Sequence, residues 1–223
     1  MVLPIQGIII SFVKTNIVQV MQIQKENIHQ QILEVSGKEF FQHGFKGTSM
    51  RTIAQKTGVG LSNIYNYFKN KDEILQAVLQ PLLDHLATLQ KGHNSVEHIN
   101  TNTFYSDEYQ RKNIQEFVEM VELYREELNL ILFHVHGSKL EDFKEELIAG
   151  YTQTGLDYLH KMKEKYPATN SNISEFFIHN YSSQWVNVLG EIVTHNLTHE
   201  ETEQFISEYI QFSTAGWKKL MRV

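Results

Sequence analysis

The chain has 223 residues, 41% of them hydrophobic, which is enough for one large domain or two smaller domains with a buried core. Three prolines and 12 glycines are too few for a fibrous or disordered protein, and the absence of cysteine excludes disulfides, thiolate metal sites and cysteine nucleophiles. The formal net charge of −6 is opposite to that expected of a nucleic-acid-binding protein, unless its basic residues are concentrated in one segment.

The first twenty residues include an apolar run, residues 3–13, that is too short to span a bilayer. No lysine or arginine precedes Lys14 and no small-residue cleavage site is present, so the run is also a poor match to a signal peptide. Met21 stands just before the first periodic segment. We therefore interpret Met21 as the natural start and residues 1–20 as an extension, with a genuine additional helix or arm as the alternative.

Helical periodicity begins at Lys25 and continues along the chain, without the alternation of apolar and polar residues that indicates a strand. It predicts a first helix over residues 25–43 that ends at Gly44. Four apolar residues face inward from this helix, namely Ile28, Ile32, Val35 and Phe40.

Residues 44–73 contain the most informative pattern, two short helices joined by a tight turn. Thr48 and Ser49 can begin the first of these helices, because a side-chain oxygen accepts a hydrogen bond from an unpaired N–H of the first turn. Ile53 and Ala54 supply a small buried face.

Glycines at positions 58 and 60 predict the corner that follows, since glycine readily adopts the left-handed conformation that ends a helix. The second helix is expected over residues 61–68, with Ile64 and Phe68 four residues apart on its buried face. Polar side chains lie off that face, as a reader of base edges requires: Ser62, Asn63, Tyr65 and Asn66.

This segment resembles the DNA-binding signature of the TetR family of transcriptional repressors over residues 25–79. The matching positions are Gly44-Phe45, Thr48-Ser49, Ile53-Ala54, Gly58-Val59, Ile64-Tyr65, Tyr67-Phe68 and Lys71-Asp72-Glu73. Gly60 and Asn66 depart from the serine and histidine that the family often has there, and this leaves the operator sequence open. Residues 24–72 also carry seven lysines or arginines against four acids, so the positive charge is concentrated in this part of the chain.

The resemblance implies which residues contact double-stranded DNA. Base contacts are expected from Ser62, Asn63 and Asn66, with Leu61 placed to touch a thymine methyl group. Phosphate contacts, which set the register, are expected from Thr48, Ser49, Tyr65, Tyr67 and Lys71.

Capping boxes predict the starts of four later helices, because each has a cap residue followed by glutamate three positions on. The boxes are Asn70–Glu73, Ser138–Glu141, Asn172–Glu175 and Thr198–Glu201, and their helices run to about residues 90, 165, 196 and 220. Two more helices are expected over residues 107–124 and 126–136, with a polar segment over residues 91–106. The fold class is therefore all-α.

Pro81 lies inside the helix expected from Lys71. It lacks the N–H that would bond to the Ala77 carbonyl, so we expect a kink there, or alternatively the end of the helix. Since the resemblance makes this helix the link between two domains, a bend in it bears on regulation.

The last two helices are apolar on more than one face, which indicates that a second surface is also covered. In the TetR family these helices form a four-helix bundle between two copies, so we predict a homodimer; a buried hairpin within one copy is the alternative. Expected interface residues are Phe177, Tyr181, Trp185, Ile210 and Trp217.

The middle helices are rich in aromatic residues that predict a small-molecule pocket, although packing in the core is the simpler interpretation. The candidates are Phe117, Met120, Tyr124, His134 and Tyr151. His134 and His136 point to nearly opposite sides of a helix, so they do not predict a metal site. Because nucleotide-binding and hydrolase motifs are also absent from the sequence, we expect neither a cofactor nor an enzyme.

Together these patterns predict a cytoplasmic, homodimeric transcriptional regulator without a membrane segment. Residues 21–70 would form a three-helix DNA-binding domain, and residues 71–223 a helical bundle for effector binding and dimerisation. A repressor released from a palindromic operator by a small molecule is the expected mechanism. Control by a protein partner is the alternative, and activation in place of repression is left open.

Overall fold

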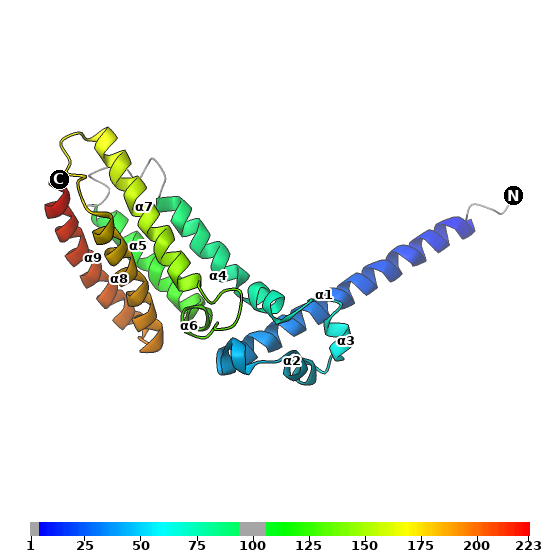
Figure 1. Cartoon of the computed structure of the whole chain (residues 1–223). Coiled ribbons are helices and arrows are strands. Elements are labelled where there is room, and N and C mark those ends of the chain that lie inside the picture. The colour runs from blue at the N-terminus through cyan, green and yellow to red at the C-terminus, as the bar shows by residue number, and fades with distance from the viewer. Residues whose placement is uncertain (1–4, 94–105) are drawn as a thin grey trace. The chain divides into compact units, whose positions relative to one another are not determined.

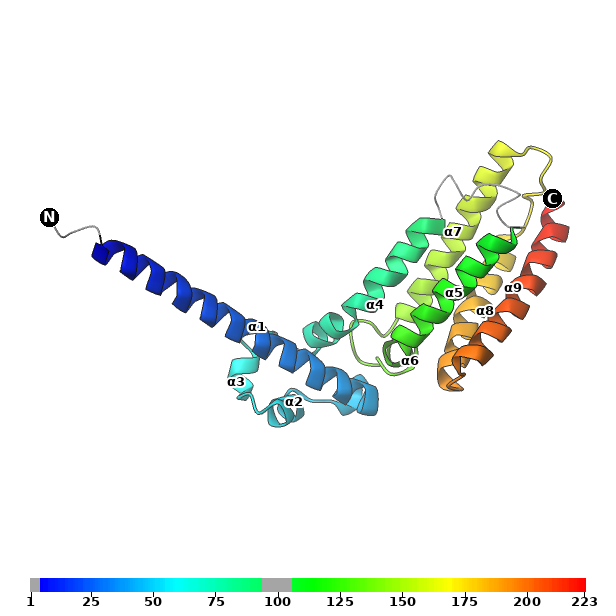
Figure 2. The same cartoon turned by 180° about the vertical axis from the view of Figure 1, so that it is seen from behind.

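The computed structural model of the chain describes the backbone of residues 5–93 and 106–223, and the side chains of residues 22–90 and 106–223. Within these ranges every regular element is a helix, in agreement with the predicted all-α class (Figures 1 and 2). The chain divides into two compact units, Met1–Val78 and Leu79–Val223. This division falls later than the predicted boundary at residue 70, inside a helix that supplies residues to both units.

The N-terminal unit contains α1 (Ile5–Gly47), α2 (Met50–Thr57), α3 (Leu61–Ile64) and the first part of α4 (Lys71–His93). The α1 backbone is helical over residues 5–20 as well, so it begins well before the predicted start at Lys25; residues 1–4 lie outside the described residues. Gly44 departs from helical geometry, with φ 65° and ψ 176°. The chain turns there because glycine tolerates a positive φ that most residues avoid.

Apolar side chains from all four helices form the core of the N-terminal unit. Ile32 and Phe40 of α1 are fully buried, as predicted, whereas Ile28 and Val35 are only half-buried. They share the interior with Phe45, Ile53, Ile64, Phe68, Ile74 and Leu75.

The helix α4 begins at the predicted cap. The Asn70 side chain accepts a hydrogen bond from the Glu73 N–H at 3.0 Å, and the Glu73 carboxylate accepts one from the Lys69 N–H at 2.7 Å. The helix then continues through Pro81, so it does not end at the proline. Most of the polar segment expected over residues 91–106 lies outside the described residues.

The C-terminal unit adds α5 (Asp107–Leu123), α6 (Arg125–Phe133), α7 (Phe143–Lys165), α8 (Glu175–Thr194) and α9 (His199–Met221). In both views α7 runs along α8, and α5 packs against α9 (Figures 1 and 2). Of the helices described, none is long and apolar enough to cross a membrane.

Two predicted helix boundaries are wrong. Residues 134–142 form turns, in which the Ser138 hydroxyl accepts from the Leu140 N–H, so α6 ends at Phe133 and α7 begins at Phe143. Ser174, rather than Asn172, caps α8 by accepting from the Phe177 N–H at 3.2 Å. Both segments have the glutamate of the capping pattern. The hydrogen bond that forms there, however, is not the cap that the pattern predicts.

Candidate nucleic-acid interface and ligand cavity

A helix-turn-helix is formed by α2, the corner at residues 58–60, and α3. The Ser49 hydroxyl caps α2 by accepting from the Thr52 N–H at 3.0 Å, and Gly58 ends the helix in the left-handed conformation, with φ 69°. Thr57 supports the corner, since its hydroxyl donates to the Ile53 carbonyl and accepts from the Val59 N–H. The predicted turn is therefore confirmed in its start, its end and its corner.

The second helix of the motif is shorter than predicted, because α3 ends at Ile64 and the chain tightens beyond it. The Asn66 N–H donates to the Asn63 carbonyl at 3.0 Å and the Tyr67 N–H to the Ile64 carbonyl at 2.9 Å, which are three-residue bonds. The Asn66 amide also donates to the Asn63 side-chain oxygen at 3.2 Å. Local side-chain bonding of this kind favours a turn over continued helix.

The expected base-reading residues lie on one accessible surface. Ser62 and Asn66 are exposed and Leu61 and Asn63 are half-exposed, while Ile64 and Phe68 hold the segment to the core. Tyr65 is also exposed. We call this surface, made of Leu61, Ser62, Asn63, Tyr65 and Asn66, the reading surface.

Tyr67 is half-buried beside the reading surface, against α1. The His29 ring stacks on Phe68 with centroids 4.9 Å apart, and it lies 6.3 Å from the Tyr67 ring at a tilt of 49°. The base of the reading surface thus rests on an aromatic contact with α1, which positions it.

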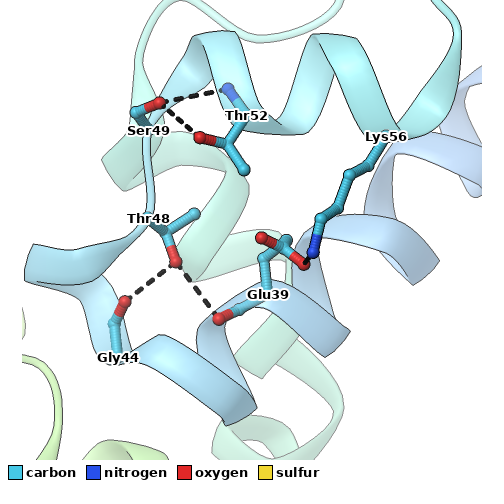
Figure 3. Close-up of polar contacts among 6 residues, drawn as sticks. All are labelled: Glu39, Gly44, Thr48, Ser49, Thr52 and Lys56. Atoms are coloured by element: carbon cyan, nitrogen blue, oxygen red, sulfur yellow. Dashed lines mark hydrogen bonds and ion pairs between the residues drawn. The ribbon is translucent and has the colours of Figure 1, made fainter.

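Thr48 is not on the surface, contrary to its expected phosphate contact. Its side chain is 3% exposed, and its hydroxyl lies 2.9 Å from the Gly44 carbonyl oxygen and 3.2 Å from that of Glu39 (Figure 3). A hydroxyl that bridges one buried and one partly buried carbonyl ties the end of α1 to the start of α2. Ser49, next to it, does lie at the surface, where it also contacts the Thr52 hydroxyl at 2.8 Å.

Lys71 is likewise drawn inward. Its ammonium donates to the Phe45 carbonyl at 2.5 Å and to the Thr48 carbonyl at 2.7 Å, and it lies 3.9 Å from the centre of the Phe45 ring. Partial burial lowers the pKa of Lys71, with an opposing contribution from Asp72. Two of its three donors are therefore used within the unit, so a phosphate contact would have to compete with these bonds.

Glu39 is a structural residue that the sequence pattern did not reveal. Its side chain is 4% exposed and forms an ion pair with Lys56 of α2, seventeen residues further along the chain (Figure 3). A buried carboxylate needs such a partner, so the pair fixes α2 on α1. No spacing rule links these positions, and only the tertiary fold brings them together.

A cavity of about 420 Å³ lies within the C-terminal unit, among α4, α5, α7, α8 and α9. Of the five predicted pocket residues, Phe117, Met120 and Tyr151 line it. Tyr124 does not, because its ring packs edge-on against His85, 5.5 Å away. His134 is exposed beyond the end of α6 and does not line it either.

Four of the predicted dimer-interface residues line this cavity instead: Tyr181, Trp185, Ile210 and Trp217. The second apolar stripe on α8 and α9 thus faces an internal cavity within one copy, and the predicted place of these residues at a contact between copies stays a prediction. Phe177 is 44% exposed and touches the Trp217 ring edge-on at 5.7 Å. The side chains of Phe176 (77%) and Phe212 (80%) are more exposed still.

Several of the aromatic side chains that line the cavity contact one another. Trp185 lies 5.1 Å from Phe117 and 5.6 Å from Tyr209, and Trp217 meets Tyr181 at 5.2 Å in an edge-on contact. Burial raises the pKa of Tyr209 to about 12, with a further contribution from the neighbouring Tyr181. Burial also raises the pKa of Tyr151, opposed by a hydrogen bond with Trp185.

The described residues contain no group of three or more histidines, aspartates or glutamates placed to hold a metal ion. The chemical groups gathered in the two sites are amides, hydroxyls and aromatic rings. Such groups suit recognition by hydrogen bonding and stacking.

Comparison with known proteins gives a consistent result for the helix-turn-helix. Residues 32–78 match the model of a family described as bacterial regulatory proteins, tetR family. An HTH-type transcriptional regulator of Bacillus subtilis (strain 168), YhgD, is 38% identical over 66 residues, which are 30% of this chain and 34% of that protein. An HTH-type transcriptional regulator of Staphylococcus aureus (strain USA300) is 38% identical over 60 residues, 27% of this chain and 32% of its own. The matched segment thus spans about a third of each relative.

Solved structures resemble a larger part of the fold. A TetR-family regulator from Syntrophomonas wolfei has a TM-score of 0.58 at 18% identity, with 86% of this chain and 96% of that chain covered. The regulator FadR from Bacillus subtilis, solved in complex with stearoyl-CoA, has a TM-score of 0.58 at 14% identity, with 84% and 98% covered. At these identities the likeness concerns the fold alone.

Proposed function

Because the chain belongs to the tetR family of bacterial regulatory proteins, we propose that it is a cytoplasmic DNA-binding repressor that a small molecule releases from its operator. The reading surface is the observation that carries this proposal. It joins exposed amide and hydroxyl groups to a short helix held by buried Ile64 and Phe68, within a segment rich in basic residues. Amide side chains at such a position suit hydrogen bonds to base edges in the major groove.

In the DNA complex, α3 enters the major groove, with Ser62, Asn63 and Asn66 on base edges and Leu61 near a thymine methyl group. Ser49, Tyr65 and Tyr67 contact phosphates and set the register. Arg51 is exposed one residue inside the start of α2, so it is a further candidate for a phosphate contact in place of Thr48.

Two copies act together on a palindromic operator, with half-sites about one helical turn apart. Since Trp185 and Trp217 face the cavity, we assign the contact between copies to the outer surfaces of α8 and α9. Phe176 and Phe212 are exposed there, and an exposed aromatic side chain loses water-accessible apolar area when a second copy covers it.

The cavity supports control by a small molecule rather than by a protein partner, since it provides an interior site of the size that small ligands occupy. FadR, a structural neighbour, holds stearoyl-CoA, a small molecule. Release requires the effector to bind the DNA-free arrangement more tightly than the DNA-bound one, and the operator must then weaken effector binding by the same factor.

The test uses Asn63→Ala, with Asn180→Ala as the matched control, because Asn180 is an exposed helical asparagine outside the helix-turn-helix. An operator is selected from random duplexes, and anisotropy titrations then compare it with a scrambled duplex. Asn63→Ala should cost about 1–3 kcal/mol on the operator and little on the scrambled duplex. Equal losses on both duplexes, or no selected sequence at all, would contradict the assignment of the reading surface.

A further inference from the structure

Two asparagines of the reading surface, Asn63 and Asn66, are hydrogen-bonded to each other. The Asn66 amide donates to the Asn63 side-chain oxygen at 3.2 Å, and the Asn66 backbone N–H donates to the Asn63 carbonyl at 3.0 Å. Side chains three residues apart eclipse one another where the backbone is bonded in this three-residue pattern, so the tightened turn beyond Ile64 brings the two amides together. The pair exists in the free protein, and both side chains are therefore oriented before DNA binds.

This bond leaves the two amides with different free groups, because the oxygen and the NH2 group of an amide lie on opposite sides of the same carbon. Asn63 turns its oxygen toward Asn66 and keeps both donors of its NH2 group for another partner. Asn66 turns its nitrogen toward Asn63 and keeps its oxygen as an acceptor, together with its second N–H donor. Asn63 thus offers two donors, whereas Asn66 offers one donor and one acceptor.

The major groove of DNA distinguishes these two patterns. Guanine presents two acceptors there, O6 and N7, whereas adenine presents the N7 acceptor beside the N6 donor. Side chains three residues apart have Cβ atoms roughly 5–6 Å apart, which suits neighbouring base pairs with a rise of about 3.4 Å.

From this geometry we propose that the Asn63–Asn66 pair is a single recognition unit, in which Asn63 selects guanine and Asn66 selects adenine in neighbouring base pairs of each half-site. The inference rests on the proposed function and names the bases that the reading surface recognises. A paired reader differs from two separate readers, because the preference at one base position depends on the residue that reads the other.

Asn66→Ala tests this dependence. The Asn63 oxygen loses its partner in this variant, so the Asn63 amide can turn and offer an acceptor as well as a donor. The variant should therefore lose the adenine preference at one position and the guanine preference at the other. Two independent readers would keep the guanine preference, since their contributions would simply add.

Asn63→Asp tests the direction of the bond within the pair. The new carboxylate still accepts from Asn66 but has no donor, so the preferred base at the guanine position should change to cytosine, whose N4 amino group donates. The adenine preference should remain. Gln55→Glu is the matched control, because it converts another exposed amide of the helix-turn-helix to a carboxylate outside the reading surface. It should weaken binding to all duplexes without changing either preference.

The measurement begins with selection of an operator from random duplexes by the full wild-type chain. Anisotropy titrations then use duplexes in which each base pair of one half-site is replaced in turn. For the wild type, replacing the guanine or the adenine should weaken binding by roughly 5- to 150-fold. The variants are checked by circular dichroism, and either one decides the question if the other does not fold.

Three results would overturn the inference and leave the proposed function intact. They are an operator without a neighbouring guanine and adenine, a guanine preference that survives Asn66→Ala, and the reversed assignment, in which Asn63→Asp removes the adenine preference. If the wild-type chain binds every duplex equally, the proposed function is wrong and the inference is wrong with it.

Discussion

Single residues around the helix-turn-helix divide between recognition and support, and burial decides which role each one has. Thr48 and Ser49 are neighbours with similar hydroxyl groups, yet Ser49 is exposed at the start of α2 and Thr48 is 3% exposed. Lys71 uses two donors on carbonyls within the unit. A hydroxyl residue of the type that often contacts phosphate thus stabilises the fold at Thr48, whereas the one at Ser49 remains accessible to DNA.

Replacing Thr48 with valine tests this division, since valine keeps the shape but removes the bridging hydroxyl. The change should lower the free energy of unfolding by about 1–3 kcal/mol, because the buried Glu39 carbonyl and the partly buried Gly44 carbonyl lose the hydroxyl donor. Chemical denaturation of the variant measures this loss. Thr88→Val is the control, because that exposed hydroxyl bonds only to the Asp84 carbonyl of its own helix.

DNA binding by the Thr48→Val variant should keep the salt dependence of the wild-type chain, since no phosphate contact is removed. A variant that is as stable as wild type but binds every duplex more weakly would instead restore Thr48 to the DNA surface.

At the scale of whole elements, local caps determine where helices begin only when no competing hydrogen bond is available. The box at Thr198 is complete: its hydroxyl accepts from the Glu201 N–H at 3.3 Å, and the Glu201 carboxylate accepts from the Thr198 N–H at 2.8 Å. Near Ser138 the same spacing produces turns, in which Glu141 accepts from the Gly137 N–H. Gly137 has a φ of 81°, which a continuing helix could not include.

The α9 cap predicts a defined pH dependence. Hydrogen bonds from the Thr198 backbone and side chain lower the pKa of Glu201 below its ordinary value of 4.5. A lowered carboxyl pKa in the folded chain stabilises it above pH 4.5, and this contribution is lost as the pH falls through the lowered value. Glu201→Gln should therefore reduce the melting temperature at pH 7, and the difference from wild type should disappear in acid.

Thermal unfolding between pH 3 and 7 provides the measurement for Glu201→Gln. The control is Glu200→Gln, which removes a neighbouring charge from the first turn of α9 but leaves the cap acceptor in place. A gap in melting temperature that is the same at pH 3 as at pH 7 would mean that the charge of Glu201 does not stabilise the cap.

For the molecule as a whole, the proposed function requires the C-terminal unit to provide both an internal cavity and a contact between copies. The apolar residues of α8 and α9 fall into three groups: those in the core, such as Val186 and Ile192, those on the cavity wall, and those exposed at the surface, such as Phe176 and Phe212. Assigning the dimer to the exposed group gives each stripe a separate role.

Phe212→Glu tests this assignment, because a charge in a buried contact between copies is strongly unfavourable while the exposed site tolerates it in one copy. The variant should be a folded monomer by sedimentation and circular dichroism. Leu123→Glu, an exposed apolar residue of α5, should remain dimeric. A dimeric Phe212→Glu protein would show that this surface is not the contact between copies. Trp217→Glu should instead lower the melting temperature, because it places a charge in the cavity wall.

Periodicity and turn chemistry were sufficient to predict the all-α class, the helix-turn-helix and most helix positions. These features depend on interactions between residues a few positions apart: Ser49 with Thr52, Asn70 with Glu73, and Gly58 at the end of α2. The resemblance carried by residues 25–79 added the family and the expected reading surface.

Only the tertiary structure placed residues whose partners are distant in the chain. Glu39 meets Lys56, Lys71 reaches Phe45, and Trp217 lies beside Tyr181 on a cavity wall. A second apolar stripe on a helix shows that something covers it, but the stripe is the same whether the cover is another copy, the core or a ligand. That choice depends on long-range packing, which the pattern of a single helix does not contain.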